Sequence, residues 1–552
     1  MTLLSVRKLR TEILTRDGPR VVVDDLGFSL SPGEVLAIIG ESGSGKSIAM
    51  QSITGLLPSP PARVTGDTAL FEGVDLLLLP ERDLRKIRGN RIGMIFQEPM
   101  SALNPMMPVG DQIAEAIMTH RGTGWSSARA EAVRLLDRVR ITDAANRARQ
   151  RPAALSGGMR QRVVIAAAIA CKPVLVIADE PTTALDATVQ IQVLILLRKI
   201  QAEMGMGVIF VTHDLGVVAE IADRVAVMYR GRLVETGPVA SVFHSPRTRY
   251  TRHLIGSSAK FTVTGDQARG GTPPTRERPL LEVEGLDLTF RKRTGLIFRR
   301  TREFHALKNV SFTLNEGENL GIVGESGSGK TTLVRALVGL AKADSGRAIY
   351  RSKDGREFDL LQRGALRGAG LNREIRMVFQ DPFSSLNPRM TVEQVIAEPL
   401  VLEKRLTRPQ IRDRVAALLE RVGLPASVMS RYPYAFSGGQ RQRISIARAI
   451  AVDPRVIIAD EATSALDGSI RSQILDLLFD LQSELGVSYL FVGHDLGVVR
   501  YFCDRIAVMH RGELVELGPA ASICQTPQKD YTKRLLAAVP ATDPDRRRLL
   551  TA

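Results

Sequence analysis

Short runs of consecutive apolar residues, each ended by polar residues, recur along the chain. Two of them lead directly into glycine-rich segments: Val35–Ile39 precedes Gly40, and Leu320–Val323 precedes Gly324. Such runs are typical of strands that are buried on both faces of a parallel sheet. Similar runs occupy residues 174–178, 208–211, 456–459 and 489–492. We therefore predict an α/β fold whose functional groups lie at the carboxyl ends of the strands.

The order of these runs and of the motifs after them occurs twice. GESGSGKS at Gly40–Ser47 returns as GESGSGKT at Gly324–Thr331, and three later motifs return after a displacement of 281 residues. A repeat of this length indicates two homologous domains. We place the first domain at 1–258 and the second at 279–552. Residues 259–278 between them are rich in glycine, proline and charge, which is typical of a flexible linker.

Composition narrows the possible partners and locations. The 552 residues include 75 lysines and arginines against 59 acidic residues, and the net charge of +16 favours a polyanionic partner such as nucleotide phosphate, nucleic acid or an acidic membrane. The three cysteines share no close spacing, which argues against zinc and iron–sulfur sites and indicates a reducing compartment. The longest apolar stretches, such as Val163–Cys171, are shorter than the roughly 18 residues of a membrane span. The N-terminus lacks the apolar core of a secretory signal, so we expect no export.

The repeated glycine-rich segment matches GxxxxGK[ST], the pattern of a phosphate-binding loop after a strand. Its glycines let the backbone approach phosphates, its N–H groups form an anion-binding concavity, and the next helix adds the positive end of its dipole. Lys46 and Lys330 are predicted to reach the β- and γ-phosphates, and the hydroxyls of Ser47 and Thr331 suit Mg²⁺. The predicted loops comprise Gly40, Glu41, Ser42, Gly43, Ser44, Gly45, Lys46 and Ser47, and Gly324, Glu325, Ser326, Gly327, Ser328, Gly329, Lys330 and Thr331.

Two apolar runs end in paired carboxylates, at Asp179-Glu180 and at Asp460-Glu461. An isolated acidic pair is often only a solvated strand end. The fixed spacing from the phosphate loop favours a catalytic interpretation. Asp179 and Asp460 are then expected to hold the metal through water, and Glu180 and Glu461 to polarise the attacking water.

Two further motifs repeat in the same register. His213 and His494 end apolar runs in the contexts FVTHDLGVV and FVGHDLGVV, and we expect each to contact a γ-phosphate. Ser-Gly-Gly opens a predicted helix twice, where an N-cap hydroxyl and free N–H groups form a second anion site. This second site comprises Ser156, Gly157 and Gly158, and Ser437, Gly438 and Gly439.

Together these motifs resemble those of the nucleotide-binding domains of ABC transporters, and the resemblance covers essentially the whole chain. It implies two tandem P-loop NTPase domains, each with a RecA-like α/β core, an antiparallel β portion and a helical subdomain. It also implies ATP and Mg²⁺ as cofactors. The glutamines Gln97 and Gln380 correspond to Q-loops that help to bind the metal. Ala184–Asp186 and Ala465–Asp467 correspond to D-loops.

The resemblance further implies a head-to-tail sandwich, in which the phosphate loop of one domain and the Ser-Gly-Gly signature of the other enclose each ATP. One site is then expected to use Lys46, Gln97, Glu180 and His213 with Ser437, Gly438 and Gly439. The other is expected to use Lys330, Gln380, Glu461 and His494 with Ser156, Gly157 and Gly158. The chain departs from the family pattern at Met159, Phe436, Ala462 and Gly493. None of these departures removes a phosphate, metal or water-activating group, so we expect both sites to hydrolyse ATP.

A narrower resemblance appears after each Q-loop and near the end of each domain. FQEPMSALNP and FQDPFSSLNP, and the tails around Tyr250 and Tyr531, are similar to those of importers of dipeptides, oligopeptides, nickel and glutathione. The resemblance implies two transmembrane permeases and an extracytoplasmic solute-binding protein as partners, and no nucleic acid. It places the chain peripherally on the cytoplasmic face of a bacterial inner membrane. The amphipathic segments 98–155 and 381–436 either dock the permeases or form ordinary helical subdomains.

Other functions remain open at this point. Tandem ATPases that act on ribosomes are disfavoured, because they have a long charged linker between their domains. Those of DNA repair are disfavoured because they carry zinc cysteines or coiled coils. ATPases of sugar importers lack the Leu-Asn-Pro element. Basic residues at 291–293 and 299–302 either contact lipid headgroups or form a solvated loop, and the same holds for 546–548. Phe290 is a candidate for stacking on adenine in the second domain, whereas Ile13 stands at the matching position of the first.

Overall fold

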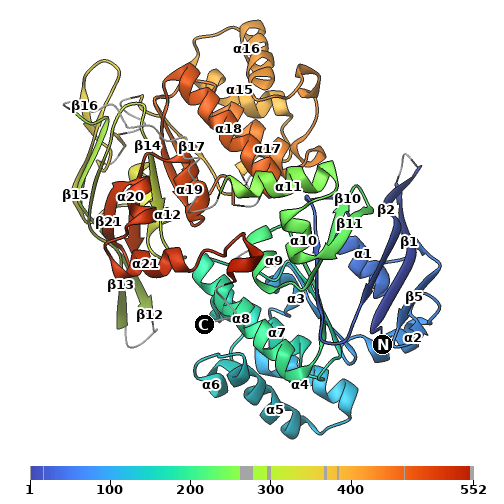
Figure 1. Cartoon of the computed structure of the whole chain (residues 1–552). Helices are drawn as coiled ribbons and strands as arrows, with labels where there is room; N and C mark the ends of the chain where they lie inside the picture. Colours follow the sequence, from blue (N-terminus) through green and yellow to red (C-terminus); the bar gives the residue numbers. More distant parts are fainter. Residues whose placement is uncertain are drawn as a thin grey trace. The chain divides into compact units, whose positions relative to one another are not determined.

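Contacts within the chain divide it into two units. The computed structural model describes residues 2–15, 18–182, 185–261, 278–294, 300–362, 364–365, 370–381, 385–464 and 466–547. Unit 1 is Met1–Ala259 with Pro540–Ala552, and unit 2 is Lys260–Val539 (Figure 1). The sequence assigned residues 540–552 to the second domain, whereas their contacts place them with unit 1. Most of the predicted linker, residues 262–277, lies outside the described residues, as do Ala184 and Ala465 of the D-loops.

The centre of unit 1 is a mixed sheet in the order β11-β10-β3-β9-β8-β7, counted over the described residues. Neighbouring strands from β10 to β7 run parallel, and β11 is antiparallel to β10. Both faces of the sheet are covered, because Leu36 and Ile38 enter one hydrophobic cluster and Ala37 and Ile39 another. The strands are β3 (Val35–Ile39), β7 (Ile92–Ile95), β8 (Leu175–Asp179), β9 (Gly207–Thr212), β10 (Arg224–Tyr229) and β11 (Arg232–Pro238).

A smaller antiparallel sheet and a set of helices complete unit 1. The small sheet has the order β2-β1-β5-β6, and β4 also pairs with β1. Its strands are β1 (Leu4–Thr15), β2 (Gly18–Leu30), β4 (Ala62–Thr65), β5 (Thr68–Phe71) and β6 (Val74–Asp75). The helices are α1 (Lys46–Ile53), α2 (Glu81–Ile87), α3 (Pro99–Ala102), α4 (Val109–Arg121), α5 (Trp125–Arg138), α6 (Ala144–Ala148), η1 (Pro152–Ala154), α7 (Gly157–Ala168), α8 (Ala187–Met204), α9 (Leu215–Ile221), α10 (Val239–His244), α11 (Arg249–Ala259) and η4 (Pro544–Arg546).

Unit 2 repeats this architecture. Within the described residues its larger sheet has the order β17-β18-β19-β14-β20-β21, and its antiparallel sheet the order β13-β12-β15-β16. The strands are β12 (Leu281–Thr294), β13 (Arg300–Leu314), β14 (Asn319–Val323), β15 (Ser345–Arg351), β16 (Glu357–Asp359), β17 (Ile375–Val378), β18 (Val456–Asp460), β19 (Ser488–Gly493), β20 (Arg505–His510) and β21 (Glu513–Pro519). The helices are α12 (Lys330–Leu337), α15 (Val392–Glu403), α16 (Arg408–Arg421), η2 (Ala426–Val428), η3 (Pro433–Ala435), α17 (Gly438–Ile450), α18 (Gly468–Leu485), α19 (Leu496–Phe502), α20 (Ala520–Gln525) and α21 (Asp530–Ala537).

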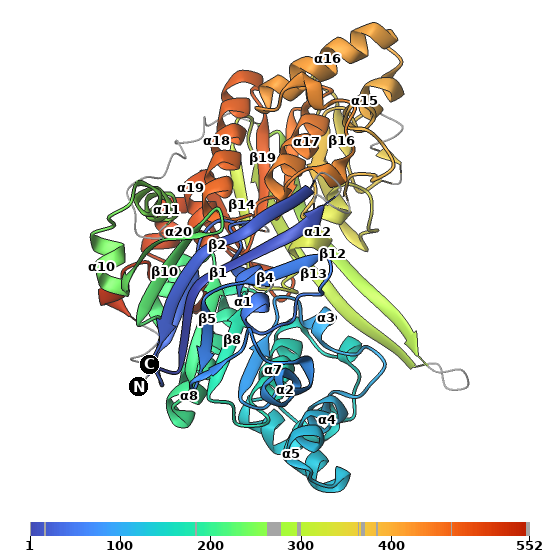
Figure 2. The same ribbon diagram turned by 90° about the vertical axis from the view of Figure 1, so that its right-hand side faces the viewer.

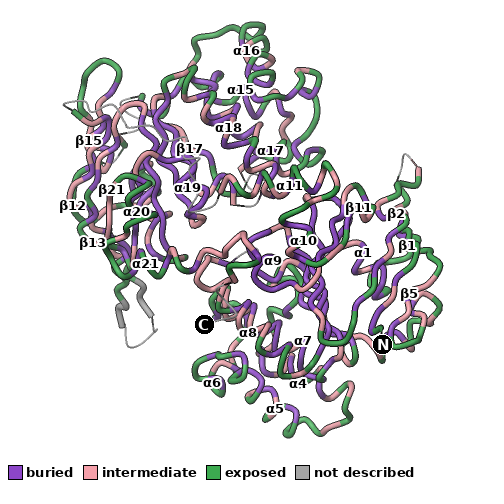
Figure 3. Tube along the Cα trace, viewed as in Figure 1, coloured by how far each residue is buried: buried purple, intermediate pink, exposed green. Residues whose placement is uncertain are grey.

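The strands predicted from the apolar runs are present in both units, with ends that differ by at most one residue. The central strands β3, β8, β9, β14, β18 and β19 are buried along their whole length. Figure 3 shows buried stretches of the trace, in purple, inside each unit. The segments between each Q-loop and signature form helices, among them α4, α5, α15 and α16. Among the described residues, no helix is both long enough and apolar enough to cross a membrane.

The structure describes part of each of the two basic segments, for which lipid contact and a solvated loop were the alternatives. Residues 291–294 belong to β12 and 300–302 to β13, so the backbone there forms a long hairpin (Figure 2). Residues 295–299 lie outside the described part. In the second segment, Arg547 donates hydrogen bonds to the carbonyl oxygens of Ala222 and Pro544. The tail therefore uses an arginine to pack against its own unit.

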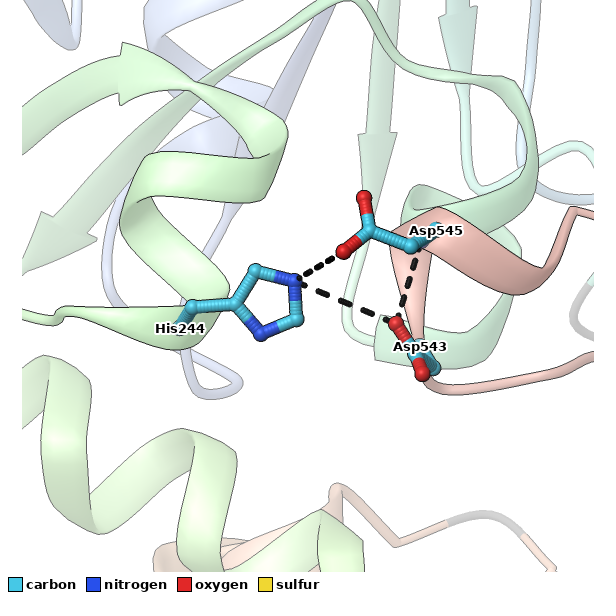
Figure 4. Close-up of side chains that lie close together, drawn as sticks. All are labelled: His244, Asp543 and Asp545. Carbon is cyan, nitrogen blue, oxygen red and sulfur yellow. Dashed lines mark hydrogen bonds and ion pairs between the residues drawn. The ribbon is translucent and has the colours of Figure 1, made fainter.

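The C-terminal tail is held on unit 1 by contacts with α9 and α10. The N–H of Ala541 donates to Glu220 Oε1 over 3.1 Å. His244, at the end of α10, points toward two aspartates of the tail, with its Nε2 2.9 Å from Asp545 Oδ2 and 3.9 Å from Asp543 Oδ1 (Figure 4). These three side chains are largely open to solvent, so their attraction is screened and contributes little to stability.

Candidate nucleotide site

The predicted phosphate loop of unit 1 connects β3 to α1 at the carboxyl edge of the sheet. The Lys46 ammonium is buried and donates to Gly40 O over 2.8 Å and to Glu41 O over 2.9 Å. These bonds fold the lysine back along the concave side of the loop. In unit 2, Lys330 makes the same bonds to Gly324 O over 2.7 Å and to Glu325 O over 2.9 Å.

The chemistry of both loops fits a bound polyphosphate. Ser44 Oγ and Ser328 Oγ are buried and have no hydrogen-bond partner among the described residues. Buried hydroxyls of this kind usually have a partner, and a phosphate oxygen is a suitable one. Gly43 has a φ of 79° with no atom within 4 Å of an added Cβ, so the loop leaves room above its backbone.

Asp179 lies at the end of β8, two strands from the loop in the sheet order β3-β9-β8. Its Oδ1 accepts a hydrogen bond of 2.9 Å from Ser47 Oγ at the start of α1. Burial and the neighbouring Glu180 raise the pKa of Asp179, while Ser47 and Lys46 oppose the shift. The structure therefore brings together the carboxylate and the hydroxyl that the sequence assigned to the metal.

The corresponding carboxylate of unit 2, Asp460, has a different hydrogen-bonding environment. Asp460 Oδ1 is buried without a hydrogen-bond partner in the described part of the chain. Burial, strengthened by the charge of Glu461, raises the pKa of Asp460 to about 6. A carboxylate that is desolvated and unpartnered gains most from a cation, so this aspartate fits a divalent metal.

The glutamate after each aspartate contacts both a glutamine and a histidine. In unit 1, Gln97 Nε2 donates to Glu180 Oε2 over 2.8 Å, and His213 Nδ1 lies 3.1 Å from Glu180 Oε1. Gln97 follows β7 and His213 follows β9, the two neighbours of β8. Three residues that are far apart in sequence thus meet because their strands are adjacent.

Unit 2 has the same cluster. Gln380 Nε2 donates to Glu461 Oε2 over 2.7 Å, and His494 Nδ1 lies 3.4 Å from the same oxygen. Burial raises the pKa of Glu461, but the hydrogen bond and charge of His494, together with Lys330, outweigh it, so the pKa lies below its usual value. Glu461 is therefore charged at neutral pH, as a group that polarises water must be.

Both glutamates have a backbone conformation that is rare outside glycine. Glu180 has a φ of 46° and Glu461 a φ of 48°, and each N–H donates to the strand beside it, at Val211 O and Val492 O. A left-handed residue of this type costs roughly 1 kcal/mol or more. The surrounding strands hold both carboxylates in this strained geometry.

The Ser-Gly-Gly signatures lie where a helix begins. Ser156 Oγ accepts the N–H of Met159 at the start of α7, and Ser437 Oγ accepts that of Gln440 at the start of α17. Gln440 also bonds back to the N–H of Ser437, whereas Met159 has no amide side chain with which to do so. The described hydrogen bonds of Ser156 and Ser437 thus serve as helix caps within their own units.

Two tyrosines whose role no motif indicates lie against the phosphate loops. Tyr250 Oη accepts the N–H of Glu41, and Tyr531 Oη accepts the N–H of Glu325, each over 3.1 Å. The sequence did contain a sign that the two tyrosines are equivalent. Tyr531 follows Tyr250 by 281 residues, the same displacement as that of the later repeated motifs. The adenine candidate Phe290 is half exposed on β12 and faces Phe304 across the hairpin, and Ile13 is partly exposed on β1.

Comparison of the sequence with protein-family profiles identifies the fold and the activity of the chain. The profile described as "ABC transporter" matches residues 23–183 and 307–464. The chain belongs to the ABC transporter family. It is thus an ATP-binding protein and an ATPase coupled to transport, built from two tandem P-loop NTPase domains, as its motifs predicted. A second profile, "Oligopeptide/dipeptide transporter, C-terminal region", matches residues 234–281 and 515–552, which contain Tyr250 and Tyr531.

Relatives in this ABC transporter family extend over the whole chain. The glutathione import ATP-binding proteins GsiA of Shigella boydii serotype 4 (strain Sb227) and Escherichia coli (strain K12) are each 47% identical over 569 residues, which cover 99% of this chain and 90% of theirs. Among solved structures, cbiO1 from Clostridium perfringens is 30% identical with a TM-score of 0.38, covering 46% of this chain and 93% of its own. A dimeric bacterial ABC transporter cassette is 29% identical with the same TM-score, covering 44% and 98%.

Proposed function

We propose that this chain is the energy-coupling subunit of an importer for glutathione, dipeptides or oligopeptides. One observation carries the proposal: the relatives named for glutathione import match 99% of the chain, including both nucleotide sites. The matched oligopeptide/dipeptide C-terminal region supports the same class of solute. Two permeases in the membrane and an extracytoplasmic solute-binding protein complete the assembly. The chain then lies on the cytoplasmic face, held there by the permeases.

Each unit binds one ATP through the same set of groups. Lys46 or Lys330 contacts the terminal phosphates, and the loop N–H groups and the orphaned hydroxyl of Ser44 or Ser328 surround them. Mg²⁺ would be held by Ser47, Gln97 and Asp179 in one site and by Thr331, Gln380 and Asp460 in the other. It would supply positive charge against the negative charge that develops on the phosphates.

Hydrolysis requires a base and a group that senses the γ-phosphate. Glu180 and Glu461 accept a proton from the attacking water, since each is a carboxylate directly beside the aspartate that holds the metal. His213 and His494 hold these glutamates and contact the γ-phosphate. Each ATP is closed in by the signature of the other domain, Ser437–Gly439 for the first site and Ser156–Gly158 for the second. Closure by ATP drives the permeases, and hydrolysis releases them.

Replacing His213 or His494 by alanine is expected to slow ATP turnover by about 10-fold or more while ATP still binds. The imidazole positions the glutamate and makes only one contact with the γ-phosphate, whereas the loop lysine and N–H groups supply most of the phosphate binding. Steady-state hydrolysis and calorimetric ATP titration measure the two effects. Replacement of the exposed His253 by alanine is the control. Unchanged turnover in both variants would demote the two histidines to structural residues.

Removal of Mg²⁺ by EDTA is expected to abolish hydrolysis in both sites. The two aspartates, Asp179 and Asp460, then repel the phosphates instead of sharing a cation with them. Phosphate release before and after EDTA, and after addition of excess Mg²⁺, measures the effect. Hydrolysis that continues at the same rate with EDTA would contradict the metal assignment.

A pull-down from membranes solubilised in mild detergent tests the proposed partners. The bait is the tagged Glu180→Gln, Glu461→Gln variant with ATP, because a chain that cannot hydrolyse should stay closed on its permeases. We expect two polytopic membrane proteins that are lost when Lys46 and Lys330 are also replaced. Ribosomal or DNA-repair proteins in place of membrane proteins would overturn the proposal.

A further inference from the structure

The phosphate loop of each unit is held from outside by a tyrosine of the C-terminal region. Tyr250 is near the start of α11, and Tyr531 near the start of α21. Their hydroxyls accept the N–H of Glu41 and of Glu325 at the same distance, 3.1 Å. The same contact therefore occurs once in each unit.

The peptide that receives this bond is the one that anchors the loop lysine. The N–H of Glu41 belongs to the same peptide plane as the carbonyl of Gly40, which accepts Lys46 Nζ over 2.8 Å. A planar peptide that is bonded at both ends cannot rotate without losing one of the two bonds. The Gly324–Glu325 peptide is held in the same way between Tyr531 and Lys330.

Each tyrosine ring packs against another ring, tilted by 34° in unit 1 and stacked in unit 2. Tyr229, at the end of β10, lies with its ring centroid 4.3 Å from that of Tyr250, and His510, at the end of β20, lies 4.0 Å from Tyr531. The strands β10 and β20 also adjoin the loop strands β3 and β14. The phenol is thus oriented by the same sheet that positions the loop.

A carboxylate fixes the turn that leads into each tyrosine helix. Glu235 accepts the N–H groups of Arg247 and Thr248, and Glu516 accepts those of Gln528 and Lys529. The threonine after each tyrosine, Thr251 or Thr532, is fully buried. The helix start is therefore rigid, and the hydroxyl it presents to the loop is held in place.

We infer that Tyr250 and Tyr531 are positioning residues for ATP binding: each hydroxyl orients the peptide that holds the phosphate-loop lysine. This role rests on the proposed nucleotide sites and gives the matched C-terminal regions a part in them. The tyrosines act through the lysines and make no contact with the reacting atoms. The two hydroxyls therefore affect the affinity for ATP and not the rate of the chemical step.

The test is the double variant Tyr250→Phe, Tyr531→Phe in the full chain, which keeps both ring contacts and removes both hydroxyls. We expect the KM for ATP to rise about 3- to 10-fold, the cost of one hydrogen bond per site, with kcat within about 2-fold of wild type. The dissociation constant of ATP, measured by calorimetry in the Glu180→Gln, Glu461→Gln background, should rise by the same factor.

Tyr350→Phe is the matched control. It removes a buried hydroxyl that donates to Glu374 over 2.7 Å in the small sheet of unit 2, away from the loops. We expect it to lower Tm while leaving the KM for ATP unchanged. A double variant whose KM stays within about 1.5-fold of wild type, or rises no more than that of Tyr350→Phe, would overturn the inference. A wild-type chain that binds no ATP would instead overturn the proposed function.

Discussion

Replacing Glu180 and Glu461 together by glutamine is expected to lower ATP hydrolysis by at least about 100-fold and to leave ATP binding intact. Glutamine keeps the shape of the side chain and can still accept from Gln97 or Gln380, but it cannot take a proton from water. Each single variant should lose only the part of the hydrolysis rate that its own site contributes. Phosphate release at saturating ATP and calorimetric titration measure rate and affinity separately.

Glu131→Gln is the control for this prediction, since it breaks only a surface ion pair with Arg134. It should hydrolyse ATP at the wild-type rate. If the double variant also turned over at that rate, neither glutamate would be the base. If only one single variant lost activity, the other site would be the one that contributes nothing to turnover.

Alanine at Gly40 and Gly324 is expected to weaken ATP binding at the altered site by about 100-fold or more. An added Cβ would lie 2.2 Å from Met228 O in β10 or 2.2 Å from Met509 O in β20, closer than any real contact. These carbonyls belong to strands of the central sheet, so the loop must move instead of the strand. Calorimetry with ATP on each single variant and on the double variant measures the loss.

Gly205→Ala separates this steric effect from the backbone preference of glycine. Gly205 has a φ of 61° at the end of α8, and no atom lies within 4 Å of an added Cβ. Alanine there should lower the free energy of unfolding by about 1 kcal/mol and leave ATP affinity unchanged. Wild-type affinity in the Gly40→Ala, Gly324→Ala double variant would contradict the close approach of loop and strand.

The apolar runs and the repeat predicted the parallel strands and the order of the motifs, because both are local properties of the sequence. The apolar run Val35–Ile39, for example, itself indicates a strand that is buried on both faces, as it is in the structure. The meeting of Gln97, Glu180 and His213 also follows from the topology, since their strands are neighbours in the sheet. The family resemblance supplied the residues whose role no periodicity indicates.

Features that depend on long-range packing were not predictable in this way. No local pattern indicates that the tail after Val539 belongs to unit 1 or that Arg547 donates to Ala222 O. The difference between Asp179, which is bonded to Ser47, and Asp460, which lacks such a partner among the described residues, arises from side-chain geometry in nearly identical motifs. In the sequence, Tyr250 stands out only by the resemblance of its segment to importer tails, because its contact with Glu41 joins residues 209 positions apart.

Uptake of labelled solute in cells tests the central claim most directly. Cells whose own copy of this chain is replaced by the wild type or by the Glu180→Gln, Glu461→Gln variant would be given labelled glutathione, a dipeptide and an oligopeptide. The account predicts that at least one of these accumulates with the wild-type chain and that its uptake falls to background with the variant. Equal uptake of all three by both strains would contradict it.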